Sequence, residues 1–371
     1  MSIWNEYKLE DLLFYEQPTA YIVETTDYND AYKTPVLTAG KSFILGYTNE
    51  TKGVFDKLPV IIFDDFTTAT QYVNFPFKVK SSAMKILHIN TELVLPKYIF
   101  YRMQTIQFDH STHKRYWIQQ YSKIKVSVPP LPEQERIVAR IEELFSQLDA
   151  GVETLKKTKA QLSVYRQAVL KEAFDQVSDR VLLGSISDSR LGKMLDKEKN
   201  VGKPYRYLRN INVRWFAFDL TDLLEMRIDD DEHDKYSIQK DDLVICEGGE
   251  PGRCAVWNKN ETIFYQKALH RVRFKDGSNP YFYMYYLWYA AQTDQLKAFF
   301  TGTGIKHLTG QSLVKLPVPT AKRVEQDRIV ADIESKLSVC DSIEQTVDAA
   351  LQQAEAMRQS ILKNAFEGKL I

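Results

Sequence analysis

The tetrapeptide Asn279-Pro280-Tyr281-Phe282 is the segment of this chain closest to a catalytic motif. Enzymes that methylate amino groups hold the target nitrogen with an Asn/Asp-Pro-Pro-Tyr/Phe motif, and here Tyr281 replaces the second proline. No glycine-rich turn precedes the segment to cradle a cofactor, and the chain has no G-x-x-x-x-G-K-[ST] loop for nucleotide phosphates. We therefore favour the simpler interpretation, in which Asn279 and Pro280 form a turn and begin a helix.

Cysteine, histidine and carboxylate residues do not form a recognisable metal or nuclease site either. Cys246, Cys254 and Cys340 have neither zinc-ligand spacing nor the number needed for a disulfide framework, so a reducing compartment is expected. The six histidines lack metal-ligand spacing, and residues 196–199, Asp-Lys-Glu-Lys, form a cluster of mixed charge. The sequence predicts no catalytic residue, no metal site and no cofactor in this chain.

The charge balance argues against a protein that binds nucleic acid on its own. The 371 residues, enough for two or three domains, include 49 basic and 49 acidic side chains. Residues 177–324 carry 23 basic and 19 acidic side chains, whereas residues 325–371 carry 5 and 9, so the excess of positive charge lies in the middle of the chain. The chain has no 18-residue apolar run and no signal-peptide pattern, which predicts a cytoplasmic protein.

A long amphipathic stretch occurs twice. Glu133–Phe174 and Glu325–Phe366 align without gaps at an offset of 192 residues (325 minus 133), and both begin with E-Q-x-R-I-V. Apolar residues recur at steps of three and four, which is the helical period. Each stretch would form a helix about 60 Å long, and its narrow apolar seam needs a partner helix. We expect the two copies to pair antiparallel within one chain. The alternative, a coiled coil between two chains, is left open by the periodicity.

Each amphipathic stretch is preceded by a globular segment. Residues 1–132 and 177–324 contain short runs of β-branched and aromatic residues separated by turn clusters, and a helix-like stretch follows Pro96 and Pro280. The two segments begin and end alike, whereas their interiors share little. The sequence predicts an α+β protein with two domains, each a curled, mainly antiparallel sheet with helices. Two long antiparallel coiled-coil helices would separate them in a pseudo-twofold arrangement.

This organisation resembles the specificity subunit of a type I restriction–modification system. The resemblance covers essentially the whole chain: a divergent domain, a Pro-rich junction at residues 129–132, E-Q-x-R-I-V and a long helix, and then the same unit again. Shorter stretches that resemble this family are Val36–Lys41, Ile61–Thr68, Tyr207–Asn212, Asp241–Arg253 and Gly302–Leu308. The junction at residues 321–324 lacks the second Pro-rich element that is common in the family, which leaves the start of the second helix open.

The resemblance implies that different segments of the chain have different functions. Residues 1–132 and 177–324 would be target-recognition domains 1 and 2, each reading one half of a bipartite site in double-stranded DNA. Residues 133–176 and 325–371 would be spacer helices that set the distance between the half-sites and dock two methyltransferase (M) subunits. Those partners would bind S-adenosylmethionine and methylate adenine N6, and restriction (R) subunits, where present, would bind ATP.

The chain itself would then be non-catalytic and would bind no membrane. Two alternatives come from other classes of protein. One is a scaffold that bridges protein partners without DNA specificity. The other is a self-contained enzyme, which the missing cofactor motifs disfavour.

Reading a DNA sequence requires side chains that reach base edges and phosphate contacts that set the register. In a member of this family, the best candidates lie on turns and glycine-rich loops, where the backbone can approach a duplex closely. The residues we expect to contact DNA are Tyr47, Asn49, Lys52, Thr67, Thr68, Lys80, Ser81, Ser82, Lys114, Arg115, Arg209, Asn210, Asn212, Gly248, Gly249, Arg253, Lys306 and His307. For each of them, the alternative is a role in a turn, a cap or a surface charge.

Overall fold

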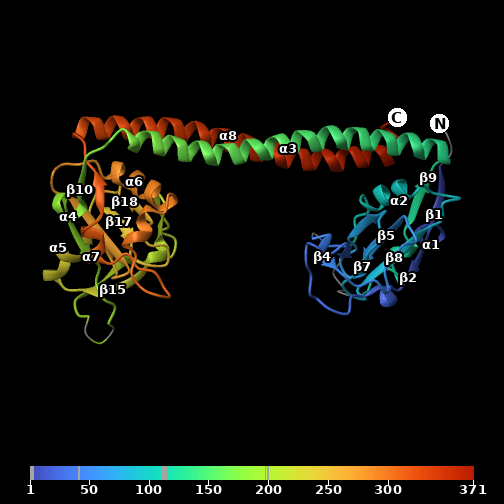
Figure 1. The fold of residues 1–371 in the computed structure, drawn as a ribbon, viewed down its shortest axis with the longest axis horizontal. Helices are drawn as coiled ribbons and strands as arrows, with labels where there is room; N and C mark the ends of the chain where they lie inside the picture. The colour runs from blue at the N-terminus through green and yellow to red at the C-terminus, as the bar shows by residue number, and fades with distance from the viewer. Residues whose placement is uncertain (1–3, 41, 110–114, 197, 199) are drawn as a thin grey trace. The chain divides into compact units, whose positions relative to one another are not determined.

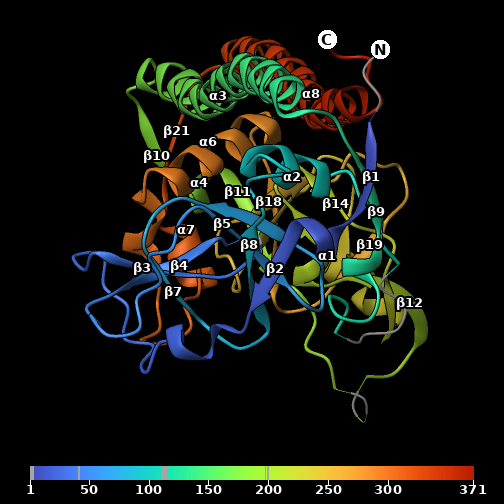
Figure 2. The same cartoon turned by 90° about the vertical axis from the view of Figure 1, so that its right-hand side faces the viewer.

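The computed structural model describes residues 4–40, 42–109, 115–196, 198 and 200–371. The chain divides into two compact units: unit 1 is Met1–Leu155 with Asp348–Ile371, and unit 2 is Lys156–Val347. Each unit contains a sheet-rich domain and segments of two long helices, α3 (Leu131–Asp175) and α8 (Arg323–Phe366) (Figure 1, Figure 2). The predicted α+β class, with two sheet-rich domains and two long helices, is confirmed.

The domain of unit 1 consists of short strands with few helices. Its elements are β1 (Asn5–Lys8), α1 (Leu9–Leu12), β2 (Leu13–Glu16), a 3-10 helix (Pro18–Tyr21), β3 (Thr34–Leu37), β4 (Ile44–Thr48), β5 (Val60–Asp64), β6 (Thr70–Val73), β7 (Lys78–Val79), β8 (Met84–Ile89), α2 (Pro96–Met103), a 3-10 helix (Tyr121–Lys123) and β9 (Lys125–Val128). The main sheet has the antiparallel order β2-β8-β5-β6. A smaller sheet, β4-β3-β7, includes the parallel pair β3–β7, and β1 pairs with β9.

The domain of unit 2 repeats this plan with additional elements. They are β10 (Arg180–Leu182), α4 (Leu183–Ile186), β11 (Ser187–Leu191), β12 (Lys203–Leu208), a 3-10 helix (Asn210–Asn212), β13 (Val213–Arg214), β14 (Ala217–Phe218), β15 (Leu224–Ile228), a 3-10 helix (Asp230–Glu232), α5 (His233–Tyr236), β16 (Ser237–Ile238), β17 (Leu243–Cys246), β18 (Cys254–Val256), β19 (Ile263–Tyr265), β20 (Leu269–Phe274), α6 (Pro280–Gln292), a 3-10 helix (Gln295–Phe299), α7 (Gly310–Val314) and β21 (Pro317–Pro319). The sheets have the orders β11-β20-β17-β18 and β15-β12-β19-β16, with β10 paired to β21 and β13 to β14.

The two domains share one frame. The pair β1–β9 corresponds to β10–β21, the sheet β2-β8-β5-β6 to β11-β20-β17-β18, and helix α2 to α6. Helices α3 and α8 begin at Leu131 and Arg323, which are 192 residues apart, although only the first junction is rich in proline. The start of the second helix, left open by the sequence, is therefore equivalent to that of the first. Both starts lie two residues before the expected ones. The assignment of separate functions to the four predicted segments stays a prediction.

Oppositely charged side chains join α3 to α8 within each unit. The ion pairs are Arg166–Asp341 (2.7 Å), Arg166–Glu344 (2.8 Å) and Glu172–Lys336 (3.6 Å) in unit 2, and Asp149–Arg358 in unit 1. Residues further along α3 pair with residues earlier in α8, since Arg166 contacts Asp341 and Glu172 contacts Lys336. The helices therefore run antiparallel and pair within one chain, as expected. Exposed ion pairs contribute about 1 kcal/mol at most. The apolar seam therefore supplies most of the stability, and the charges fix the direction and register.

In unit 1, the domain packs on the beginning of α3 and the end of α8. Ile137 and Ile141 of α3 and Leu362 of α8 are buried in one hydrophobic core with Tyr98 of α2. The Phe366 ring packs edge-on against Tyr98, with ring centroids 5.2 Å apart. Two segments far apart in the sequence therefore close the same core.

In unit 2, the same arrangement uses the other ends of the helices. Phe174 near the end of α3 packs edge-on against Phe282 and Tyr286 of α6, at 5.4 Å between ring centroids in both cases. Ile329 and Ile333, near the start of α8, join this core. The aromatic side chains of α6 therefore belong to the hydrophobic core and do not form a ligand platform.

The described residues contain neither a membrane-spanning helix nor a metal-binding cluster. No helix in that part of the chain is both long and apolar enough to cross a bilayer. No group of three or more His, Cys, Asp or Glu side chains there is placed to hold a metal ion.

Candidate functional site

The three candidate clusters of unit 2 meet at the loop between β17 and β18. Asn210 Nδ2 donates a hydrogen bond to the backbone oxygen of Gly248. Arg253 Nη2 donates to the backbone oxygen (3.1 Å) and to Oδ1 (2.9 Å) of Asn210, while its Nη1 lies 2.9 Å from Glu250 Oε2. A Cβ atom on Gly248 would lie 3.0 Å from His307 Nδ1. Residues from three separate parts of the sequence thus form one loop cluster.

Glycine is required twice in this loop. Gly249 has a φ of +74°, in the left-handed region that favours glycine, and a Cβ atom there would lie 2.8 Å from Asn210 Nδ2. Gly252 has a φ of +93°, and its Cβ atom would lie 2.6 Å from Leu296 Cδ1. The loop therefore depends on glycine for both its backbone conformation and its close approach to Asn210.

Arg209 and Asn212 hold the loop that carries Asn210. Asn212 is buried, and its Oδ1 accepts a hydrogen bond from the backbone N–H of Arg209 (2.9 Å). Its Nδ2 donates to the backbone oxygens of Asp219 and Asp222, both at 3.0 Å. Arg209 Nη2 donates to the backbone oxygen and Oδ2 of Asp222, both at 2.7 Å. These contacts favour a supporting role for both residues, and their contact with DNA stays a prediction.

Other side chains of the cluster are presented to solvent. Lys306 is exposed, with its Nζ 2.8 Å from the backbone oxygen of Gly302. Ile211, between Asn210 and Asn212, is 51% exposed, and Ile305, beside Lys306, is 74% exposed. The sequence analysis selected neither isoleucine. The available signal was an apolar residue isolated among polar neighbours on a loop without periodicity.

Two titratable groups behind the cluster are held neutral. Burial raises the pKa of the Cys246 thiol to about 11, although Arg253 opposes the shift. Burial lowers the pKa of His270, and its Nε2 donates to the backbone oxygen of Leu308 at 2.9 Å. Because neither group is charged at neutral pH, they support the loops rather than contribute charge to a bound ligand.

In unit 1, part of the candidate set borders a surface hollow of about 410 Å³. Its lining is Thr38, Gly40, Ser42, Leu45, Asp64, Lys80, Ser81 and Met84. Ser82 follows on the same loop and is exposed. Thr67 and Thr68 lie on the turn between β5 and β6, where Asp64 Oδ1 accepts the backbone N–H of Thr67 at 2.9 Å and Thr68 has a φ of +57°. The hollow and this turn share Asp64, so the structure brings two predicted groups together.

Arg115 belongs to the same neighbourhood. Its guanidinium lies 5.9 Å from the ring centroid of Phe66, which is on the turn between β5 and β6. The backbone N–H groups of Tyr116 and Trp117 donate to the backbone oxygen (2.9 Å) and to Oδ1 (2.8 Å) of Asp65. The segment after residue 114 is therefore attached to this turn. Lys114 itself lies outside the described residues.

Tyr47 lies on β4, and Asn49 and Lys52 follow this strand in the next loop. Within the described residues, none of the three lines the hollow. Lys78 Nζ holds this loop, since it donates to the backbone oxygen of Lys52 and lies 2.7 Å from Glu50 Oε2. Asn49 and Lys52 are exposed, whereas Tyr47 is half-buried. These three residues form a group of their own.

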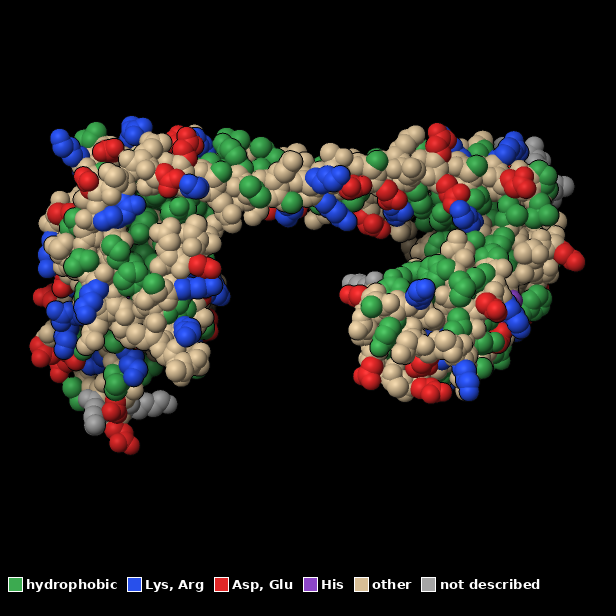
Figure 3. Space-filling model, viewed as in Figure 1, with side chains coloured by type: hydrophobic (Ala, Val, Ile, Leu, Met, Phe, Trp, Pro, Cys, Tyr) green, Lys and Arg blue, Asp and Glu red, His purple; other side chains and the backbone are tan. Residues whose placement is uncertain are grey.

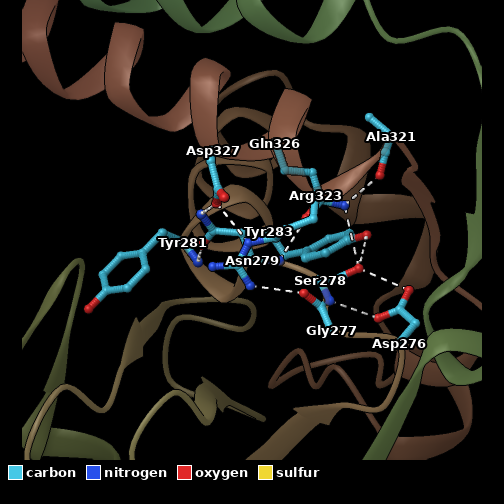
Figure 4. Close-up of polar contacts among 10 residues, drawn as sticks. All are labelled: Asp276, Gly277, Ser278, Asn279, Tyr281, Tyr283, Ala321, Arg323, Gln326 and Asp327. Carbon is cyan, nitrogen blue, oxygen red and sulfur yellow. Dashed lines mark hydrogen bonds and ion pairs between the residues drawn. The ribbon is translucent and has the colours of Figure 1, made fainter.

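The structure accounts for the Asn279-Pro280-Tyr281-Phe282 segment without catalysis. Asn279 is the N-cap of α6: its Oδ1 accepts the backbone N–H of Tyr281 at 2.9 Å, and Pro280 occupies the first helical position. Asn279 Nδ2 donates to Oδ1 of Asp327 on α8 at 2.7 Å. Figure 4 shows this contact, and Arg323 bonding to the same carboxylate. The interpretation as a turn and helix start is confirmed.

The molecular surface agrees with the neutral composition. On the face drawn in Figure 3, Lys and Arg side chains of unit 2 lie among Asp and Glu side chains. Basic side chains on that face do not form a continuous stripe. This face therefore offers no large basic surface to a polyanion.

Comparison with known proteins gives a consistent result. The model of the family described as "Type I restriction modification DNA specificity domain" matches residues 1–163 and 183–353. The specificity subunit of the Escherichia coli type I restriction enzymes EcoR124I and EcoR124II is 45% identical over 174 residues, which are 44% of this chain and 43% of that subunit. The EcoKI specificity subunit of E. coli K12 is 25% identical over 67% of this chain and 58% of its own length. The matches thus span about half the length of these curated relatives.

Solved structures share the fold. A chain from the structural study "Structural basis underlying complex assembly and conformational transition of the type I R-M system" superimposes with a TM-score of 0.75 at 16% identity, over 99% of this chain and 98% of that one. The HsdS subunit from Thermoanaerobacter tengcongensis gives a TM-score of 0.58 at 16% identity, over 99% and 97% of the two chains.

Proposed function

Because the chain belongs to the family of type I restriction modification DNA specificity domains, we propose that it is the sequence-reading subunit of a type I restriction–modification complex. Each domain reads one half of a bipartite site in double-stranded DNA. The helices α3 and α8 set the distance between the half-sites and dock two methyltransferase subunits. The chain contributes recognition and no chemistry of its own.

The observation that carries this proposal is the loop cluster of unit 2. Asn210, Gly248, Arg253 and His307 come from distant parts of the sequence and meet on loops whose glycines let these residues pack closely against one another. Unit 1 presents a different set of loops on the same frame, around Asp64. One frame with two sets of loops suits a protein that reads two different half-sites.

Catalysis would reside in the partners. A methyltransferase subunit would bind S-adenosylmethionine and flip the target adenine out of the duplex before methylating N6. A restriction subunit, where present, would bind ATP. The neutral net charge of the chain fits this arrangement, because the partners would supply much of the phosphate affinity. A complex with these reactions would act in the cytoplasm, where the DNA is.

Mapping N6-methyladenine across the genome tests the proposed function. The chain is expressed with its methyltransferase partner, and the partner alone serves as the control. We expect a split motif with a fixed gap only when this chain is present. A stable complex that adds no motif would instead favour the alternative, a protein-bridging scaffold without DNA specificity.

Ile305 is expected to contact a thymine methyl group in the half-site of domain 2. An exposed apolar side chain at a base edge favours thymine through its C5 methyl group. We expect Ile305→Ala to weaken selection for thymine at one position by about fivefold, as the loss of roughly 1 kcal/mol of apolar contact implies. The measurement compares methylation of oligonucleotides in which uracil replaces each thymine in turn.

In the wild type, uracil should reduce methylation at one position, and in I305A the substitution should have no effect there. The control is Ile118→Ala in unit 1, since Ile118 is 54% exposed. It should leave the half-site of domain 2 unchanged. Equal sensitivity to uracil in I305A and the wild type would contradict the assignment.

Gly249→Ala is expected to impair DNA reading beyond its effect on stability. Alanine at positive φ costs roughly 1–2 kcal/mol, and the added Cβ would also displace Asn210. The matched control is Gly277→Ala, because Gly277 has a φ of +76° but open space around its Cβ position. Both variants should lose the stability that positive φ costs, G249A more than G277A because it also displaces Asn210, and only G249A should reduce methylation, by about tenfold for a displacement worth ~1.4 kcal/mol. Equal methylation by both variants would contradict the role of this loop.

A further inference from the structure

A buried glutamine links each domain to the start of a long helix. Gln134 lies in the first turns of α3 and Gln326 in those of α8, exactly one repeat offset of 192 residues apart. Their exposed fractions are 0% and 1%. Both belong to the E-Q-x-R-I-V motif, in which the sequence alone assigned no role to the glutamine.

In unit 1, the Gln134 amide uses its acceptor and both of its donors. Its Oε1 accepts the backbone N–H of Leu95 (2.8 Å), the N-cap residue of α2. Its Nε2 donates to the backbone oxygens of Leu93 (3.0 Å) and Pro129 (2.8 Å). One side chain thereby joins α3, the beginning of α2 and the junction before α3. Only an amide supplies an acceptor and two donors at one position.

In unit 2, Gln326 makes the equivalent contacts. Its Oε1 accepts the backbone N–H of Asn279 (2.7 Å), the N-cap residue of α6. Its Nε2 donates to the backbone oxygen of Ala321 (3.0 Å) and lies 3.4 Å from Ser278 Oγ. Figure 4 shows Gln326 reaching from α8 onto this turn. Ala321 and Pro129 are themselves 192 residues apart, so the contacts with the N-cap and with the junction repeat in both halves of the chain, whereas the third partner differs.

A second contact joins the short helix to the long helix in unit 1. Tyr101 of α2 donates to Glu142 of α3 at 3.5 Å, and burial together with Glu142 raises the pKa of Tyr101 to about 12. In unit 2, burial and Glu334 of α8 raise the pKa of Tyr285 of α6. Glu142 and Glu334 are again 192 residues apart. In unit 1, α2 is therefore attached to α3 at two points, which fixes the angle between them.

We propose that Gln134 and Gln326 are positioning residues that set the angle of each recognition domain on its spacer helix, and thereby restrict the complex to one gap between half-sites. This inference rests on the proposed function. Neither glutamine touches DNA. The angle is fixed because the amide binds the N-cap of the domain helix and the backbone of the junction together.

The test uses Gln134→Met and Gln326→Met, which keep the side-chain length and remove all the hydrogen bonds. The complex with its methyltransferase partner is given a library of sites that differ only in gap length. We expect each variant to methylate neighbouring gaps, one base pair shorter or longer, with unchanged half-site sequences. Gln134→Glu and Gln326→Glu keep the acceptor but lose the donors, so their range of gaps should be narrower than that of the methionine variants. The exposed Gln120→Met and Gln292→Met are the matched controls.

A readout that does not involve DNA is hydrogen exchange in the full chain. The amides of Leu95 and Asn279 should exchange slowly in the wild type and about tenfold faster in the matching methionine variant, because their buried hydrogen-bond acceptor is lost. In the glutamate variant, which keeps the acceptor, their exchange should stay slow. Unchanged exchange in the methionine variants would overturn the proposal, as would a single unchanged gap or loss of methylation at every gap. If the wild-type complex methylates no split motif, the proposed function is wrong. Hydrogen exchange then still shows whether Gln134 and Gln326 protect the amides of Leu95 and Asn279. Where one methionine variant does not fold, the methionine variant of the other unit supplies the exchange measurement, and the glutamate variant supplies the range of gaps.

Discussion

Adding one helical turn to both α3 and α8 is expected to lengthen the gap between the two methylated half-sites by one to two base pairs. A turn adds about 5.4 Å, and a base pair of DNA rises about 3.4 Å. The insertions belong after Leu155 in α3 and after Val347 in α8, where the two compact units divide. Inserting in both helices keeps the ion pairs of each unit in register. The original gap should no longer be methylated, which makes this the largest functional effect we expect.

Methylome sequencing of the variant complex provides the measurement. An insertion of the same residues after Asn260, in the exposed loop between β18 and β19, is the control and should leave the gap unchanged. An insertion in α3 alone should disrupt the pairing and abolish methylation. A double insertion that still methylates the original gap would show that the helices do not set the spacing.

Asp65→Ala is expected to destabilise unit 1 by about 3–5 kcal/mol, because it leaves a buried charge without its partner. Asp65 and Lys85 are each 2% exposed, with Oδ2 and Nζ 3.3 Å apart. The Lys85 ammonium also lies 4.6 Å from the ring centroid of Tyr15, which does not replace a carboxylate. The variant additionally removes the acceptor of the Trp117 N–H. Chemical denaturation of the full chain, followed by a probe in unit 1, gives the change in the free energy of unfolding.

A double variant separates the effect of the unpaired Lys85 charge from the effect of the lost acceptor for the Trp117 N–H. Asp65→Asn with Lys85→Met keeps an acceptor for Trp117 and removes the buried charge, so its stability should lie within about 1.5 kcal/mol of the wild type. Glu6→Ala is the control for an exposed pair, since Glu6 and Lys125 are largely exposed, and it should cost less than about 0.5 kcal/mol. Equal losses in D65A and E6A would mean that the buried pair does not stabilise the domain.

The repeat made most of the architecture predictable. The offset of 192 residues predicted two equivalent helices, and the structure starts them at Leu131 and Arg323. The helical period could not show that the helices pair within one chain, because the apolar seam of a second molecule would be an equally good partner. The contact between Arg166 and Asp341 decides the question, and it depends on which side chains face each other across the seam.

The loops were predictable, but the roles of individual residues were not. Glycines at 248, 249 and 252 marked the loop that the structure places at the centre of the unit 2 cluster. The polar side chains chosen there, Asn212 and Arg253 above all, are bonded to the loops themselves. A sequence does not reveal whether a polar group is satisfied internally, since its partners come from other loops. Ile211 and Ile305 were not selected as candidates, because isolated exposed apolar residues on a loop show no hydrophobic periodicity.

The packing of α8 on the first domain has a consequence for synthesis of the protein. Leu362 and Phe366 complete the core that contains Ile137 and Tyr98, yet the ribosome makes all of unit 2 before it reaches them. At about 5–20 residues per second, the roughly 200 intervening residues delay completion of that core by about 10–40 s. Unit 2 is continuous in sequence and can fold during this interval. Although the domain of unit 1 is made before unit 2, its core is therefore completed later. Until then, only chaperones or residual structure in the partly made domain can shield its apolar side chains from water.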